Sequence, residues 1–309
     1  MNDSSSRFVS VSELVHDQRL GPDSHPGGLS PVRLPHVRDQ VARFLRDRDT
    51  PMAQDAPESV PYFDLVADHL GVADLYWVTP DMSALSVAAG AQLDTIRWPE
   101  RPSGCGLIVF AGGIGMVQYA REGAELPVDA MTWGPSPDGY LLVTMFCGRW
   151  RLSANIVENQ PVQTPPLVLV GGDDFRGGDG ELPVTGLPED ARTVLSTLAA
   201  AWSLMAQPTI ASRTEAPVNR KLVRAYRRAG RPTPTVSIID LRTLYRPSTQ
   251  ESADTGRTYR HRWVVRGHWR DQPHGPGAAR RKRIYVPSYI KGPDGAPLLA
   301  RERVNVWRR

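Results

Sequence analysis

Three histidines near the C-terminus, His261, His268 and His274, are residues whose type could support catalysis or metal binding. Both kinds of chemistry need side chains that converge on one point. If residues 261–270 form a strand, alternate side chains point to opposite faces, and His261 and His268 lie on opposite sides. They cannot then share a metal ion without a bulge in the strand. The sequence therefore predicts neither a metal site nor a cofactor.

Catalysis without a metal is a separate possibility at one of these residues. His268 stands between Arg266 and Arg270, so it could act as a general base on a phosphodiester that the two guanidinium groups hold. The same arrangement suits a protein that only binds phosphate, with His268 as a hydrogen-bond donor. A metal-independent ribonuclease or toxin centred on His268 is the enzymatic alternative, and a binding protein is the favoured interpretation.

The alternation of residues in the C-terminal segment predicts a nucleic-acid-binding β-hairpin. Residues 261–270 separate into an aromatic and a cationic face, and residues 281–291 alternate between aliphatic and polar side chains. Pairing like faces gives an apolar underside and an outer plate of Arg, His and Tyr. Arginine matches phosphate oxygens and exposed rings stack on unpaired bases, which favours single-stranded RNA. The predicted contact residues are Arg262, Arg266, His268, Trp269, Arg270, Arg281, Arg283, Tyr285, Tyr289 and Lys291.

A second group of basic residues comes earlier in the chain and predicts a helix. Ser212 and Glu215 have the spacing of a capping box, and Gly230 suits the C-terminal end. The inward side is predicted to consist of Val218, Leu222, Ala225 and Ala229. The outward residues expected to bind nucleic acid are Arg220, Arg224 and Arg227, with Arg228 on the same side.

The charge of the chain is distributed unevenly between its two parts. Residues 1–210 carry 14 basic and 26 acidic residues, a net charge of −12, whereas residues 211–309 carry 23 basic and 7 acidic residues, a net charge of +16. A segment this basic needs a counter-charge. RNA, another polyanion or the acidic part of the same chain would supply it. A protein-binding adaptor that makes no nucleic-acid contact, and a hairpin whose charged face is merely solvated, therefore stay as alternatives.

The rest of the sequence predicts an α+β fold. Helical spacing of apolar residues appears at 34–49, at 62–70 and most clearly at 188–207, where Pro208 ends the helix. Short β-branched and aromatic runs between residues 75 and 171, with a turn at 133–140, predict an antiparallel sheet of about four to six strands.

We therefore expect an antiparallel sheet flanked by helices, followed by a basic C-terminal β-hairpin module. The expected divisions are a flexible N-terminal arm (1–30), an acidic α+β part that recognises the target (31–210), and a basic helix and hairpin module (211–309) packed on it. Two shorter motifs, Phe110–Gly115 and Gly171–Asp174, favour ordinary turns over a nucleotide loop or a carboxylate pair.

The sequence offers no candidate for a membrane segment. The longest nearly uncharged run, Leu107–Val117, has 11 residues and falls short of the roughly 20 that span a bilayer. The N-terminus lacks the pattern of a secretory signal, and the two cysteines, Cys105 and Cys147, are too few for a disulfide framework. These features favour a cytoplasmic protein with reduced thiols.

The C-terminal segment resembles a known pattern. Arg260–Arg270, which contains Arg-Gly-His-Trp, is followed by a glycine-rich turn and by Arg283–Gly292. This is similar to the C-terminal signature of a family found on phages and plasmids that includes a type V-A anti-CRISPR protein. The order of the preceding elements also agrees with that family: strands near 107–119, a hairpin near 130–147 and an apolar helix that ends before Pro208.

The resemblance implies a regulatory function. The anti-CRISPR member of the family recognises the emerging chain of its target and lowers the target's mRNA. By this resemblance Gly267, His268, Trp269 and Arg270 would face RNA or the ribosome, and the first 210 residues would choose the target. We therefore expect an RNA-binding regulator and favour a binding protein over an enzyme, with RNA and a nascent polypeptide or ribosome as partners.

Overall fold

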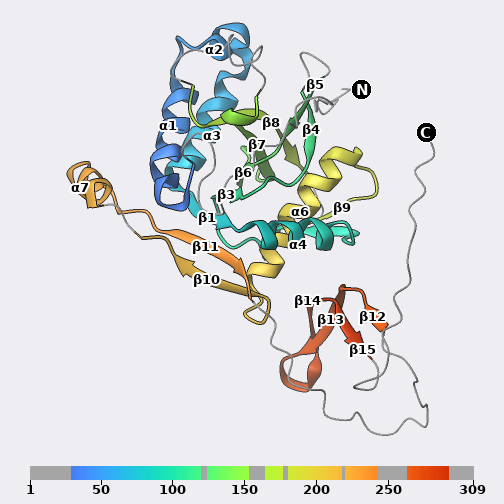
Figure 1. The fold of residues 1–309 in the computed structure, drawn as a ribbon. Helices are drawn as coiled ribbons and strands as arrows, with labels where there is room; N and C mark the ends of the chain where they lie inside the picture. Colours follow the sequence, from blue (N-terminus) through green and yellow to red (C-terminus); the bar gives the residue numbers. More distant parts are fainter. Residues whose placement is uncertain are drawn as a thin grey trace, which may run out of the picture. The chain divides into compact units, whose positions relative to one another are not determined.

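The computed structural model describes residues 29–119, 124–152, 164–176, 180–217, 220–242 and 263–291. The chain divides into two compact units, residues 1–242 and residues 243–309 (Figure 1). The first unit contains a central sheet with helices, and the second contains a β-hairpin. The expected arm, residues 1–30, falls almost entirely outside the described residues.

The first unit is built on a seven-stranded sheet. In sheet order, the strands are β10 (Ala211–Glu215), β11 (Val236–Leu241), β1 (Asp74–Val78), β3 (Gly106–Phe110), β6 (Ala130–Pro135), β7 (Leu141–Gly148) and β8 (Leu167–Phe175). The α+β class is confirmed. The sheet is mixed, however, because β1 runs parallel to both β3 and β11 while the other pairs are antiparallel. The chain passes from β1 to β3 through a helix, and such a crossover leaves the two strands parallel.

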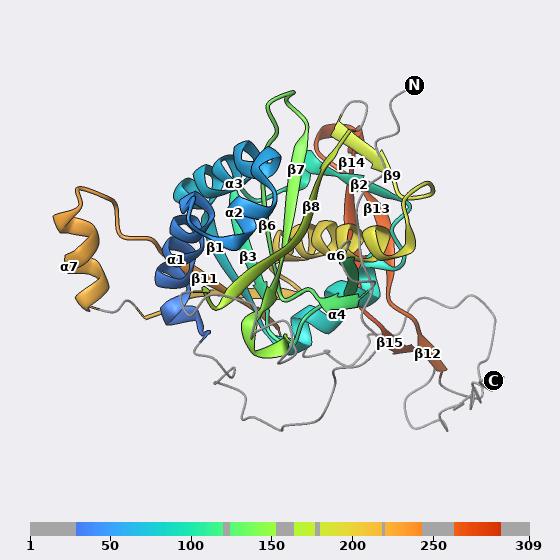
Figure 2. The same cartoon turned by 90° about the horizontal axis from the view of Figure 1, so that it is seen from above.

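Helices cover both faces of this sheet (Figures 1 and 2). One face packs against α1 (Leu34–Arg46) and α3 (Val60–Val72), with the short α2 (Pro51–Asp55) between them in the chain. The opposite face carries α4 (Pro80–Gly90) and α6 (Glu189–Met205), which pack on each other. All three helices expected from the spacing of apolar residues are therefore present.

Short strands complete the first unit. They form two separate pairs, β2 (Thr95–Arg97) with β9 (Glu181–Pro183) and β4 (Met116–Tyr119) with β5 (Ala124–Pro127). The glycine-rich segment between β3 and β4 is a turn, as predicted, because Gly112, Gly113 and Gly115 all have positive φ. The segment 171–174 was expected to form a turn and instead lies inside β8, where Gly172 lets the ring of Tyr62 pack over the strand.

The core under α6 depends on two tryptophans. Trp202 of α6 is 1% exposed, and its ring meets Trp133 of β6 edge to face with the centroids 5.2 Å apart. Trp133 in turn lies over Gly106 of β3, where a Cβ atom would stand 2.1 Å from its ring. The missing side chain at Gly106 therefore makes room for the tryptophan pair.

The segment after residue 210 belongs to the first unit, which corrects the expected boundary. Ser212 and Glu215 were expected to cap a helix, but they lie in β10, which pairs with β11. The helix α7 (Arg220–Arg228) begins later and connects these two strands. It ends at Gly230, whose φ of +64° is typical of the predicted C-terminal cap. The boundary thus lies at residue 242, and α7 and the hairpin are parts of different units.

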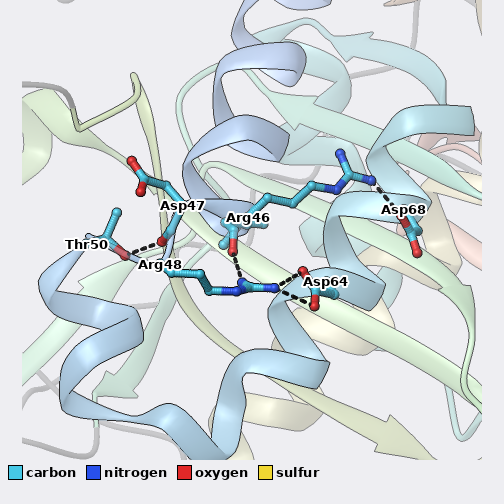
Figure 3. A network of polar contacts seen from close by, with 7 residues as sticks. Arg46, Asp47, Arg48, Thr50, Asp64 and Asp68 are labelled. Carbon is cyan, nitrogen blue, oxygen red and sulfur yellow. Dashed lines mark hydrogen bonds and ion pairs between the residues drawn. The ribbon is translucent and has the colours of Figure 1, made fainter.

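Exposed arginines of α1 and the loop after it are paired with carboxylates of α3 (Figure 3). Arg46 Nη2 lies 2.5 Å from Asp68 Oδ1, and Arg48 Nη2 lies 2.6 Å from Asp64 Oδ2. Solvent-exposed pairs of this kind contribute about 0–1 kcal/mol each. They join the end of α1 and the following loop to α3 and leave these arginines partly neutralised.

None of the helices that the structure describes combines the length and the apolar character needed to cross a membrane.

Replacing Trp202 with Ala is expected to lower the free energy of unfolding by about 3–5 kcal/mol, because it leaves a cavity beside Trp133. Denaturant unfolding of the full chain, followed by far-UV circular dichroism, measures the change. Val72→Ala is the control, since that side chain is 74% exposed and should change stability by less than about 0.5 kcal/mol. A Trp202→Ala protein as stable as the wild type would contradict the packing described above.

Candidate nucleic-acid interface

The second unit contains a hairpin in two sections. The strands β13 (His268–His274) and β14 (Arg280–Val286) pair around a turn at Pro276–Ala278. Beyond them β12 (Trp263–Val265) pairs with β15 (Tyr289–Lys291). The two predicted strands, 261–270 and 281–291, are therefore each interrupted once, at 266–267 and at 287–288. Pro287 has no amide hydrogen to donate to the ladder, which accounts for the break in the second strand.

The register of this hairpin differs from the predicted one. Trp269 lies opposite Tyr285, and Arg270 lies opposite Ile284. Residues that lie directly opposite each other share a face, so cationic residues lie on both faces, beside aliphatic residues on one face and beside the aromatic pair on the other. One face carries His268, Arg270, Gln272, His274, Arg280, Lys282, Ile284 and Val286, and the other carries Trp269, Asp271, Pro273, Arg281, Arg283 and Tyr285. The predicted single plate of Arg, His and Tyr is therefore wrong as a geometric arrangement.

Tyr285 and Trp269 pack within the hairpin. Tyr285 is 6% exposed, and its ring meets Trp269 edge to face with the centroids 5.1 Å apart. Gly267 is buried beneath Tyr285, and a Cβ atom there would stand 2.3 Å from the Tyr285 Oη atom. Packing within the hairpin thus explains both the glycine and the tryptophan of the Arg-Gly-His-Trp sequence. Their common partner is Tyr285, so its ring is not the exposed stacking surface that the sequence suggested.

The remaining predicted hairpin residues are distributed as follows. Arg266, His268, Arg270 and Arg281 are exposed, whereas Trp269 and Arg283 are half-buried. Arg262 lies outside the described residues, as do the side chains of Tyr289 and Lys291. The register also places cationic or polar residues that the sequence analysis omitted beside Arg270, namely Gln272, His274, Arg280 and Lys282. Their alternation with the predicted residues along β13 and β14 is the signal that identifies them.

His268 has no acidic group and no second imidazole group close to it among the described residues. Its Nδ1 atom lies 3.3 Å from the carbonyl oxygen of Arg266, and its face carries no carboxylate among the described residues. His274 shares this face but stands six residues further along β13, which corresponds to about 20 Å at a rise of about 3.3 Å per residue. Two imidazoles so far apart cannot act together on one phosphodiester.

The helix α7 in the first unit carries the other predicted residues. Arg220, Arg224 and Arg227 are exposed, as expected. The inward side differs from the prediction, since Ala225 and Ala229 are exposed and Tyr226 is the buried residue of the helix. Val218 lies outside the described residues. The sequence analysis counted small apolar residues and passed over the single aromatic that lies opposite the arginines.

Tyr226 is held by a polar network on α1. Its hydroxyl group donates a hydrogen bond to Asp39 and accepts one from Arg38 Nη2 at 2.7 Å. The guanidinium carbon of Arg231 lies 4.9 Å from the centroid of the Tyr226 ring, and its Nη1 atom lies 3.6 Å from Asp39 Oδ2. Burial and the hydrogen bond to the Asp39 carboxylate raise the pKa of Tyr226 to about 12. The hydroxyl group therefore stays protonated and available as a donor at physiological pH.

Two other polar residues of the first unit, His69 and Asp129, have structural explanations. The ring of His69 packs against Gly134, and burial lowers the pKa of this histidine. Asp129 accepts a hydrogen bond from the Gly148 amide at 2.7 Å and pairs with Arg151. Within the part of the chain that the structure describes, no group of three or more His, Cys, Asp or Glu residues is arranged to hold a metal ion.

Comparison of the sequence with models of protein families and with curated proteins found no match. The candidate nucleic-acid-binding residues form two separate basic surfaces. One lies on the hairpin of the second unit and the other on α7 of the first unit.

Replacing Gly267 with Ala is expected to loosen the hairpin, because the new methyl group overlaps the Tyr285 hydroxyl group. Overpacking of this kind typically costs about 1–3 kcal/mol. Hydrogen exchange followed by mass spectrometry should show faster exchange in residues 268–286 and no change in the strands of the first unit.

The double variant Gly267→Ala/Tyr285→Phe tests the cause of this loosening. It removes the atom that lies closest to the added methyl group, so exchange should return part of the way to the wild-type rate. Unchanged exchange in Gly267→Ala would show that Tyr285 does not occupy this position.

Proposed function

We propose that this protein binds RNA through the basic hairpin of its second unit. The observation that carries the proposal is the charge of residues 263–291, which include seven Arg or Lys residues and a single acidic residue, Asp271. Arg270, Arg280 and Lys282 are exposed on one face and pair with no acidic side chain among the described residues. A small module with this excess of unpaired cations needs a polyanion as its counter-charge.

The arrangement of the cations suits a phosphate backbone. Successive residues on one face of a strand stand about 6.6 Å apart, so a row of side chains can follow a chain of phosphates. On the same face His268, Gln272 and His274 add hydrogen-bonding groups between the charges. Because Trp269 and Tyr285 pack against each other, contacts with phosphate would dominate over stacking on bases.

The affinity for RNA is expected to fall steeply with salt. The double variant Arg270→Gln/Lys282→Gln should reduce the slope of log K against log[salt] by about one to one and a half, because each lost phosphate contact on a single strand removes about 0.7. Fluorescence anisotropy with a labelled single-stranded RNA, over a range of salt concentrations, measures this slope.

The matched control is Arg46→Gln/Arg48→Gln. It removes the same number of charges from arginines that already have carboxylate partners, and it should leave the slope unchanged. A wild-type slope near zero would exclude the proposal. Cleavage of the RNA that persists in EDTA and is lost in His268→Ala would establish the ribonuclease alternative instead.

We further propose that the bound RNA belongs to a specific target whose expression the protein lowers. This part rests on the resemblance of Arg260–Arg270 to the phage and plasmid family. In this proposal the acidic first unit selects the target, through a nascent polypeptide or the ribosome, and the hairpin contacts the RNA. The setting would be the cytoplasm of a cell that carries the mobile element.

Crosslinking in cells followed by sequencing is expected to recover one or a few transcripts at high enrichment. The same transcripts should fall in abundance when the protein is expressed, and Arg270→Gln/Lys282→Gln should abolish both effects. Recovery of RNA in simple proportion to its abundance would contradict target selection while leaving RNA binding intact.

A further inference from the structure

The helix α7 carries its charge on one side only. At 100° per residue, its five cations fall within an arc of about 120°, and Tyr226 lies on the opposite side. These cations are Arg220, Lys221, Arg224, Arg227 and Arg228, and all five are exposed. Leu222, Val223 and Tyr226 are the only residues of the helix that are not fully exposed. The helix is thus a short rod, about 13.5 Å long, with a continuous cationic surface.

The four arginines of this surface are not neutralised within the described part of the first unit. Arg220, Arg224, Arg227 and Arg228 form no ion pair with any described residue, in contrast to Arg46 and Arg48 of the same unit. Like charges three and four residues apart destabilise a helix. The carboxylate of Asp39 is engaged by Tyr226, Arg38 and Arg231 on the inward side. The four arginines are therefore exposed and available to an external anion.

We propose that α7 is a second RNA-binding surface, which docks on the phosphate backbone of an RNA double helix. The proposal rests on the proposed function in that the ligand is RNA, but it assigns a different surface in a different unit and a different form of RNA. Figures 1 and 2 show α7 standing out from the sheet beyond β10 and β11, and its cations are exposed.

A duplex fits this surface better than a single strand. The arc contains no aromatic side chain, and sequence-tolerant binding of single strands depends on rings that stack on bases. Double-stranded RNA is instead recognised by shape and through phosphates, including those that border its narrow major groove. The exposed cations on one side of α7 can follow such a row of phosphates.

Tyr226 is the positioning residue of this surface. Its hydroxyl group joins α7 to Asp39 and to the buried Arg38 of α1, and its ring lies beneath the guanidinium group of Arg231. The ring and hydroxyl contacts together fix the rotation of the helix about its own axis. They hold Arg224 and Arg228, at the centre of the arc, on the outer side.

The test compares two labelled RNAs, a duplex of about 20 base pairs and an unstructured single strand of equal length. The duplex is longer than the roughly 16 base pairs that a compact double-stranded-RNA-binding domain covers. In the full chain, Arg224→Gln/Arg228→Gln is expected to weaken binding of the duplex about tenfold or more and to lower its salt slope by more than one. Binding of the single strand should change less than twofold. The control Arg46→Gln/Arg48→Gln should alter neither affinity by more than twofold.

Tyr226→Phe separates positioning from charge. It keeps the ring and every cation but removes the hydroxyl group that joins Asp39 and Arg38. The affinity for the duplex should fall about threefold or more while the salt slope stays at its wild-type value, because no cation is lost. An unchanged affinity would overturn the positioning role.

Two further outcomes would overturn the assignment of duplex RNA: equal losses for both RNAs in Arg224→Gln/Arg228→Gln, and equal or tighter wild-type binding of a DNA duplex of the same sequence. Failure of the wild type to bind either RNA at low salt would instead refute the proposed function itself.

Discussion

The parallel pairing of β11 with β1 is the interaction on which the arrangement of the basic residues depends. It brings the chain after residue 210 back into the sheet of the first unit, where Val236 to Ile239 lie beside Leu75 to Val78. The strand β10 then adds to the outer edge of β11. Because α7 connects these two strands, its arginines are held on the same body as the central sheet and its helices. The charge boundary in the sequence is therefore not a boundary in the fold.

The two basic surfaces follow different structural principles. In the hairpin, the aromatic pair Trp269 and Tyr285 lies inside the module and the cations are spread over both faces. In α7, a single aromatic residue fixes the helix from one side and the cations are gathered on the other. Because the two surfaces belong to separate units, an RNA that engages both would be held at two points, which raises the effective affinity without new contacts.

Local sequence patterns predicted which helices and strands form better than they predicted strand register and the contacts between distant residues. The helices at 34–46, 60–72 and 189–205 follow from the spacing of apolar residues, and the C-terminal hairpin follows from alternation and the glycine-rich turn. Register does not follow from alternation alone, because a shift of one residue moves every side chain to the other face. The pairing of Trp269 with Tyr285 depends on the close approach at Gly267, and Tyr226 was missed because its partners Arg38 and Asp39 lie far away in the sequence.

The absence of a side chain at Gly267 leaves room for Tyr285. This packing changes what the Arg-Gly-His-Trp sequence indicates about a protein. Two of its four residues are explained by the way the hairpin closes on its own tyrosine, whatever lies outside it. A protein that shares the glycine, the tryptophan and a matching tyrosine would share this architecture even if its strands carried no excess of positive charge. The short signature therefore indicates how the hairpin packs, and not what it binds. Evidence for a common ligand would come from the residues between and beside it, at the positions of His268, Arg270, Arg280 and Lys282.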